Sequence, residues 1–193
     1  MRFLATLACA TVLAAPVFAG GHITWTSVDD QSSIAFGSVK SNEIGEVHTF
    51  SKVSGKVGEK GGVSISIDLG SVETNIDIRN ERMIEHVFQA GQATATLAGE
   101  VDMDQVNGMD VGSTKLVEFD GALTFAGAEV DVYTNLLVAR LTEDRVLVTT
   151  ADMVMVSTDE LGIDAGIDKL MQLAKLPGIT RVTPVTVRMV FEK

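Results

Sequence analysis

The segment Val63-Ser64-Ile65-Ser66-Ile67-Asp68-Leu69 alternates strictly between apolar and polar residues. A two-residue period is typical of an antiparallel β-strand that buries one face and exposes the other to solvent. The same period recurs at 94–103, 117–125 and 185–191. The sequence therefore predicts a mainly β protein whose strands each have one apolar face.

Less regular apolar runs surround these segments and indicate further strands. We expect them at 23–39, with a break at Asp29-Asp30, and at 44–57, 128–141 and 145–157. Turn-forming residues separate the runs, as at 58–62 and 107–112. About eight short strands without a βαβ rhythm favour a closed antiparallel barrel or a sandwich. An eight-stranded barrel has room for packed side chains or for one small ligand.

Two segments depart from the strand pattern and predict helices. The first, 75–88, places Met83, Val87 and other apolar residues among charged ones, which suits a short helix entered from Asp77. The second begins with a capping box at Ser157-Thr158-Asp159-Glu160 and ends before Pro177-Gly178. Such a helix, just before the last strand, either plugs one end of a barrel as part of the core or forms a lid over a cavity.

The N-terminus has the pattern of a secretory signal peptide. Arg2 precedes an apolar run that is too short to span a membrane, and Val17 and Ala19 suit cleavage before Gly20. We therefore expect a signal peptide at 1–19, one mature domain at 20–193, and a periplasmic location. Cys9 is the only cysteine of the chain and lies in the expected signal peptide, so no disulfide is expected in the mature protein.

The charge balance excludes one class of partner. The chain has 15 Lys and Arg against 26 Asp and Glu, a formal net charge of −11. Binding to nucleic acid without sequence preference requires basic side chains that neutralise phosphates, so no nucleic-acid partner is expected. The acidic surface is compatible with a homodimer whose contact is apolar.

Motifs for catalysis and for metal binding are missing from the sequence. It has no nucleophile elbow, Walker loop or dinucleotide fingerprint. His22, His48 and His86 lack metal-ligand spacing, and we interpret them as surface or turn residues. Asp102-Met103-Asp104 fails the pattern of a calcium loop. We predict a protein that is not an enzyme and has no catalytic or metal-ligating residues; Glu85 and His86 are the best candidates for the alternative, a hydrolase.

The chain resembles the YceI-like family, and the match is carried by motifs in a fixed order. Trp25-x-x-Val28-Asp29 and Ser33-Ile34-Ala35-Phe36 are followed by Val47-x-x-Phe50-x-x-Val53-Ser54-Gly55. Next come Ile67-Asp68-Leu69-x-Ser71-Val72-x-Thr74, the run Ile78-Arg79-Asn80-Glu81-Arg82-Met83, and Phe88. The sequence departs from the usual family pattern at His48, where Gly is frequent, and at 79–83, where Arg-Asp-x-His-Leu is common.

The resemblance implies an eight-stranded antiparallel lipocalin-like barrel with one or two short capping helices. It also implies that the barrel encloses an apolar tunnel for an isoprenoid chain, such as that of a polyprenyl quinone. We expect a carrier of an isoprenoid or similar amphiphilic lipid, with no resident cofactor and with a periplasmic partner that delivers the lipid. The alternative is a solid barrel that binds another protein, or has a structural role under stress, and takes no lipid.

The residues expected to contact the ligand are inward-facing apolar side chains of the strands and caps from the two helices. The expected wall comprises Phe36, Phe50, Ile65, Ile67, Leu97, Phe119, Leu123, Val187 and Met189, and the expected caps are Met83, Val87, Leu170 and Met171. Aliphatic and Met side chains of this kind accept a flexible apolar ligand without fixing its orientation.

Overall fold

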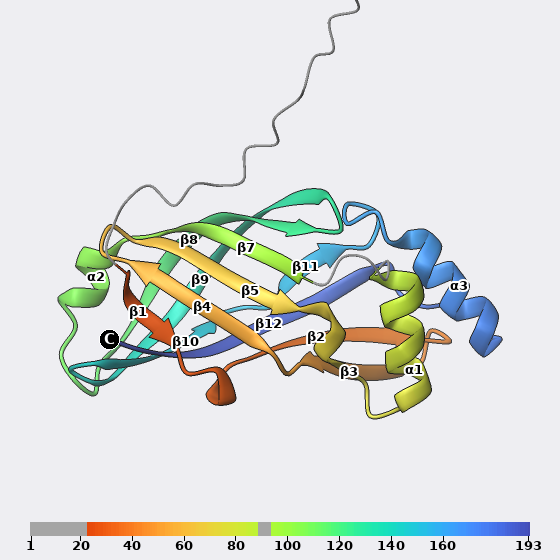
Figure 1. Ribbon diagram of the computed structural model, residues 1–193, viewed down its shortest axis with the longest axis horizontal. Coiled ribbons are helices and arrows are strands. Elements are labelled where there is room, and N and C mark those ends of the chain that lie inside the picture. Colours follow the sequence, from red (N-terminus) through yellow and green to blue (C-terminus); the bar gives the residue numbers. More distant parts are fainter. Residues whose placement is uncertain (1–22, 89–93) are drawn as a thin grey trace, which may run out of the picture.

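The computed structural model describes residues 23–88 and 94–193 of the chain (Figure 1). The expected signal peptide, its cleavage site and His22 lie outside these residues. Among the residues described, no helix is both long enough and apolar enough to cross a membrane.

The described residues form twelve strands, three α-helices and three short helical turns. The strands are β1 (Ile23–Ser27), β2 (Ser33–Lys40), β3 (Ile44–Phe50), β4 (Val53–Gly58), β5 (Gly62–Asp68), β6 (Val72–Glu73), β7 (Thr94–Val101), β8 (Thr114–Phe125), β9 (Ala128–Thr142), β10 (Arg145–Thr150), β11 (Val154–Ser157) and β12 (Val182–Glu192). The helices are α1 (Asp77–Arg82), α2 (Met103–Asn107) and α3 (Asp164–Ala174), with η1 (Asp29–Gln31), η2 (Leu69–Ser71) and the π-helical η3 (Met83–Val87).

Eight of these strands close into an antiparallel barrel. Around the barrel the order is β1, β4, β5, β7, β8, β9, β10 and β12. Thr26 and Ser27 of β1 pair with the end of β12 and close the ring. The mainly β, eight-stranded barrel expected from the sequence is therefore confirmed.

The other four strands are continuations of barrel strands across a bend. The interruptions are η1 between β1 and β2, Ser51-Lys52 between β3 and β4, η2 between β5 and β6, and 151–153 between β10 and β11. β12 shows the continuity, because β1 pairs with its last residues and β2 pairs with residues 185–188. The chain thus has eight long strands, four of them bent, in agreement with the ranges that the alternation predicts.

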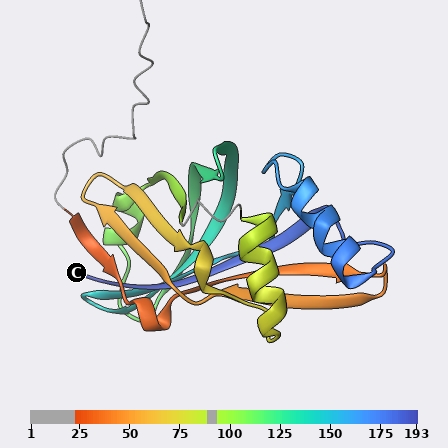
Figure 2. The ribbon, with the colours of Figure 1, turned by 45° about the vertical axis from the view of Figure 1, so that its right-hand side comes forward.

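The bends open the barrel at one end. β6 pairs only with β3, and β11 pairs only with β12, so the described strands do not form a complete ring there. Figures 1 and 2 show α1 and α3 at this end, above the extended β2–β3 ribbon, whereas α2 and the C-terminus lie at the opposite, closed end. We call the two parts the open half and the closed half.

The first predicted helix is confirmed, but the second begins later than the capping box indicates. Residues 158–162 form turns, because Gly162 adopts a left-handed backbone with φ of 68° that interrupts any helix started at Ser157. The Thr158 hydroxyl hydrogen-bonds instead with the carboxylate of Asp164, the first residue of α3. The short α2, which lies between β7 and β8, is not predicted by the sequence.

The interior of the closed half is filled by large side chains that lie over glycines. Gly99 and Gly121 face each other across β7 and β8. A Cβ atom on either glycine would come within 2.6 Å of the Phe119 ring, so both positions must lack a side chain for the ring to fit. Phe119 and Met189 are almost fully buried here. This part of the barrel is a packed core.

Candidate functional site

The open half contains a cavity of about 470 Å³. A volume of this size is within the range of pockets that hold a small molecule. Most of the lining side chains are apolar and come from four sources. These are the β2–β3 ribbon, α1 with η3, α3 with the segments on either side of it, and the inner faces of β5, β7, β8, β9, β11 and β12.

A second cavity of about 110 Å³ lies inside the closed half, between Trp25, Ile65, Phe119 and Met189 among others. Leu97, Val132, Val154 and Val187 line both cavities. The two spaces are therefore neighbours along the barrel axis, and only side chains separate them. An elongated apolar ligand that entered from the open half would have its far end directed at the smaller cavity.

Twelve of the thirteen side chains expected to contact a ligand lie on the walls of these cavities. The larger cavity is lined by Phe36, Phe50, Ile67, Met83, Val87, Leu123 and Leu170. The smaller cavity is lined by Ile65, Phe119 and Met189, and both cavities are lined by Leu97 and Val187. Met171 is the exception. It lines neither cavity, and its sulfur lies 3.6 Å from Nη2 of Arg181.

Aromatic side chains form a continuous row along the wall of the larger cavity. The ring of Phe36 lies 5.2 Å from those of both Phe50 and His48. Phe50 then contacts Phe88, which contacts Phe125, at ring-centre distances of 5.7 and 5.8 Å. Rings at these separations attract one another in tilted or offset arrangements. They give this wall a fixed shape, while Leu and Met residues provide the adaptable remainder.

The mouth of the larger cavity is polar, which the sequence analysis missed. On the inner face of the β2–β3 ribbon, Ser38 pairs with Glu46 and the next inward residue of β2 is Lys40. Glu46 Oε1 accepts hydrogen bonds from Lys40 Nζ at 2.7 Å and from Arg79 Nη1 at 2.6 Å. Burial by itself would raise the pKa of Glu46, but these two bonds hold it below its usual value.

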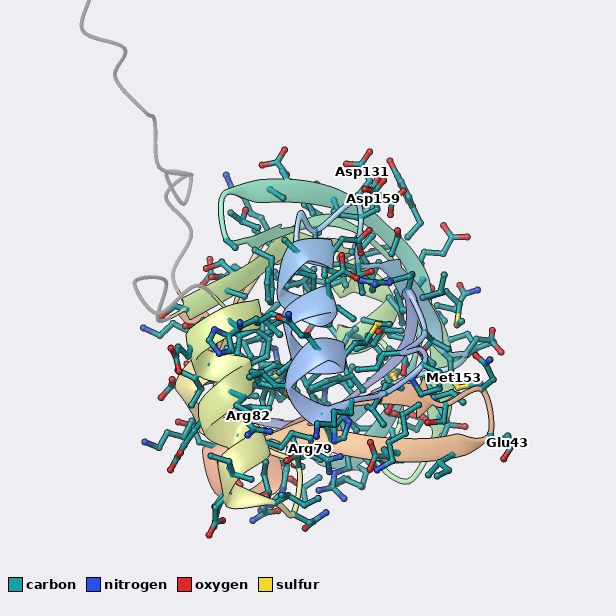
Figure 3. All side chains as sticks on the ribbon, turned by 90° about the vertical axis from the view of Figure 1, so that its right-hand side faces the viewer. Glu43, Arg79, Arg82, Asp131, Met153 and Asp159 are labelled. Carbon is teal, nitrogen blue, oxygen red and sulfur yellow. The ribbon has the colours of Figure 1, made fainter. Side chains whose placement is uncertain are left out.

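The turn before α1 fixes Arg79 at this mouth. Thr74 is buried, and its backbone N–H donates to Oδ1 of Asn80 at 2.9 Å. Its carbonyl oxygen accepts a hydrogen bond from Arg79 Nη2. The family motif that joins Thr74 to Arg79-Asn80 therefore has a structural reason, because these contacts anchor α1 to the end of β6. Figure 3 shows Arg79 and Arg82 of α1 close to the β2–β3 ribbon.

The interpretation of His48 as a surface or turn residue is wrong. Its side chain is only 4% exposed and lines the larger cavity beside Phe36. His48 Nε2 lies 3.2 Å from the Ser38 hydroxyl, whereas Nδ1 is buried and has no hydrogen-bond partner. Burial and the nearby positive charge of Arg79 lower the pKa of His48, against the opposing charge of Glu46. The ring is therefore neutral at pH 7.

A pattern in the sequence does mark this polar mouth. Inward positions of β2 change from Ile34 and Phe36 to Ser38 and Lys40, while those of β3 change from Phe50 to His48 and Glu46. Only the pairing of the two strands shows that these changes occur at the same end. Because pairing joins residues distant in sequence, alternation within one strand does not reveal it.

The two residues considered for catalysis, Glu85 and His86, are adjacent on η3 and line neither cavity. His86 Nε2 and Glu85 Oε2 are 3.8 Å apart, and the Glu85 side chain is 70% exposed. Across residues 23–88 and 94–193, no group of three or more His, Cys, Asp or Glu side chains could hold a metal ion. Asp102 accepts a hydrogen bond from the N–H of Asp104 and caps α2.

Several solved structures are similar to this chain. A polyisoprenoid-binding domain from Saccharophagus degradans, implicated in plant cell wall breakdown, is 32% identical with a TM-score of 0.85, and the match covers 88% of this chain and 98% of that one. BcnA of Burkholderia cenocepacia is 16% identical with a TM-score of 0.66, covering 85% and 98%. The YceI protein of Campylobacter jejuni is 11% identical with a TM-score of 0.53, covering 76% and 84%. The latter two similarities support the fold alone.

No curated protein matches the chain. The model of the YceI-like domain matches residues 25–188, which is most of the chain and includes all the residues that line the larger cavity. The motif order, the bent eight-stranded barrel and the agreement with the Saccharophagus domain lead to the same assignment. The protein belongs to the YceI-like domain family.

Proposed function

We propose that this protein is an exported, periplasmic carrier of an isoprenoid or similar amphiphilic lipid, such as a polyprenyl quinone. The apolar tail lies in the larger cavity and extends toward the smaller one. The observation that carries the proposal is an apolar space of about 470 Å³ inside a barrel that is otherwise packed. The binding of polyisoprenoid by the Saccharophagus domain, the most similar in sequence of the three structures compared, supports it.

The energetics favour a lipid tail as the occupant. Burial of apolar surface stabilises a complex by about 25 cal/mol for each Å². A tail that buries roughly 400 Å² therefore gains about 10 kcal/mol, and it binds when the cavity is already formed and the cost of association is at the low end of its range of roughly 4 to 15 kcal/mol. A solid barrel, the alternative in which the interior is core, would leave no space of this size.

A filling substitution tests the proposal. Leu97 lines both cavities, so Leu97→Trp places an indole between them. We expect this variant to fold and to lose at least about tenfold in affinity for a prenyl quinone, because the tail and the indole compete for the same volume. Phe119 lines the smaller cavity, so Phe119→Trp should weaken the binding only of lipids whose tails are long enough to reach that cavity.

Leu116→Trp is the matched control, since Leu116 lies on the outer face of β8 and is exposed. Titration of the mature protein with a prenyl quinone gives the affinities, and thermal unfolding confirms the fold of each variant. Normal binding by a well-folded Leu97→Trp protein would contradict the proposal. Mass spectrometry of lipid extracted from protein purified without detergent identifies the natural cargo.

Export is tested separately from binding. We expect the protein in the periplasmic fraction, with Gly20 as the first residue found by N-terminal sequencing. A protein that retains Met1 and remains in the cytoplasm would contradict this part of the proposal and leave the lipid cavity unaffected.

A further inference from the structure

The connection between β11 and β12 forms one wall of the larger cavity. We call residues 159–177 of this connection, which include α3, the α3 segment. Its apolar side chains that line the cavity are Leu161, Ile163, Ile167, Leu170, Ala174 and Leu176. Figure 3, which views the molecule from the open half, shows α3 across the end of the barrel. The α3 segment thus separates the cavity from solvent on that side.

The backbone of the α3 segment is attached to the rest of the described chain only beyond its two ends. Its own backbone-to-backbone hydrogen bonds all lie within residues 157–177. Before the segment, the N–H of Thr158 donates to the carbonyl oxygen of Arg181 at 2.9 Å. After it, the N–H of Ser41 donates to the carbonyl oxygen of Gly178 at 2.8 Å. The segment is therefore a flap between two fixed points.

The residues on either side of α3 have backbone conformations suited to hinges. Gly162 has φ of 68° and precedes the helix, and Lys175 has φ of 54° and is its C-cap. Both lie in the left-handed region, in which a right-handed helix cannot continue. Hinges in proteins are formed by a few such residues at the ends of an element. Rotation at these two positions would move α3 and leave the two fixed points in place.

One guanidinium provides most of the polar attachment of α3. Arg181, just before β12, donates from Nη1 to the carbonyl oxygen of Asp164 at 3.0 Å and from Nη2 to the carboxylate of Asp168. Outside the α3 segment, Thr158 is the only other described residue whose side chain hydrogen-bonds with α3, through Asp164. The two carboxylates and Arg181 are partly exposed, and ion pairs at the surface are weak. This attachment therefore acts as a latch that breaks readily.

The other contact of α3 is its packing on η3. A Cβ atom at Gly166 would lie 2.8 Å from the Cα atom of Val87, so the two backbones are in direct contact. Among the described residues, no hydrogen bond joins α3 to η3. Separation of the two helices would break van der Waals contacts and the bonds to Arg181 and Thr158, whereas separation of two barrel strands would break a ladder of backbone hydrogen bonds.

The polar mouth is an unfavourable route into the cavity for an apolar tail. Lys40, Glu46 and Arg79 meet there in charged hydrogen bonds. A tail that passed between these side chains would separate the charges and provide no polar partner in return. The cavity-lining side chains of α3 are all apolar. A path beneath α3 is therefore the more favourable one.

We propose that α3 is a lid, latched by Arg181, that opens at Gly162 and Lys175 and admits the lipid tail to the larger cavity. This inference rests on the proposed function, in which the cavity holds the tail. Lids that close over a bound molecule commonly control the rates of its entry and release. Arg181 lines neither cavity, so the latch is the same in the closed protein with and without lipid.

The test compares rates with affinity. Arg181→Gln removes the charge of the latch, and a geranyl benzoquinone serves as the probe. Stopped-flow quenching of Trp25, the only Trp of the chain and a residue of the smaller cavity, follows binding and release. We expect the association and dissociation rates to rise together by roughly fivefold and Kd to stay within about twofold, because the latch is lost equally from the free and bound closed states.

Asp168→Asn removes one of the same bonds from the helix and should raise both rates in the same proportion. Arg145→Gln is the matched control, because Arg145 forms a surface ion pair with Glu192 at 2.8 Å in the closed half. Equal changes in Arg145→Gln would assign the effect to net charge and refute the latch. Unchanged rates in Arg181→Gln, or a faster release with weaker binding and an unchanged association rate, would refute the lid.

Hydrogen exchange tests the lid without a ligand, and thermal unfolding confirms the fold of each variant. We expect the amides of α3 to exchange faster than those of β10 and β12, and Arg181→Gln to accelerate exchange by roughly fivefold in α3 alone. If α3 exchanges only together with the barrel, the lid is refuted even if the quinone binds. If α3 opens locally but the quinone does not bind, the carrier is refuted and the movement of α3 remains established.

Discussion

The two halves of the barrel are built from the same strands but have different interiors. In the closed half the ring is complete, and large side chains such as Phe119 and Met189 fill it except for about 110 Å³. In the open half four strands bend away, and a space of about 470 Å³ remains beneath α1 and α3. The half in which the strands form a complete hydrogen-bonded ring is therefore also the half whose interior is filled by side chains.

The helices lie at the end of the barrel where the strand pairing is incomplete. α1 and η3 connect β6 to β7, and α3 connects β11 to β12, so each helix follows a strand whose pairing is incomplete. α3 packs closely on η3, since a Cβ atom at Gly166 would lie 2.4 Å from the carbonyl oxygen of His86. The two helical segments of the cap thus pack directly on each other.

The largest expected effect compares a Phe residue in each half. Phe191→Ala in the closed half should lower the free energy of unfolding by about 3–5 kcal/mol, because Phe191 is almost fully buried and borders only the smaller cavity. Phe36→Ala in the open half should cost about 1–2 kcal/mol, since one side of its ring already faces the cavity. Chemical denaturation measures both values, and equal losses would contradict the division into packed and open halves.

An intermediate effect is expected from Gly166→Ala, which acts on the cap. The added methyl group would collide with backbone atoms of His86 and Val87, so α3 must shift away from η3. We expect a loss of about 1–3 kcal/mol in stability, and faster hydrogen exchange confined to the two helices. Gly178→Ala is the control, because its Cβ atom would meet only Asn42 Oδ1 at 3.5 Å. Faster exchange throughout the barrel would show that the cap and the barrel unfold as one unit.

The smallest effect is a pH dependence that should belong to the open half. His48 is neutral and has a lowered pKa when folded, whereas it takes up a proton near pH 6.5 when unfolded. The unfolded state therefore binds more protons between pH 6.5 and the lower folded pKa, and stability falls as the pH decreases through that window. We expect a loss of at most about 1.4 kcal/mol for each pH unit, the limit for one proton. His48→Phe should flatten this part of the profile, and an unchanged profile would assign the effect to another group.

The alternation of the sequence predicted the strands because each strand buries one face. The two-residue period of 63–69 is confirmed in β5, where Val63, Ile65 and Ile67 are buried and the residues between them are less buried. Asp29-Asp30 predicted the break at η1, since Asp is unfavourable within strands. The nine expected wall residues, all on strands, lie on a cavity wall for the same reason. Of the four expected caps on helices, Met171 does not, because helical periodicity alone does not determine how α3 is rotated against its neighbours.

Sequence alone thus determined the strand number, the inward faces, the first helix and the family. The tertiary structure decided that the interior is hollow in one half, since a cavity depends on how far apart facing walls lie. It also decided that His48 is buried and shares a mouth with Lys40, Glu46, Arg79 and Arg82. These residues come from β2, β3 and α1, and only pairing and packing bring their charges together.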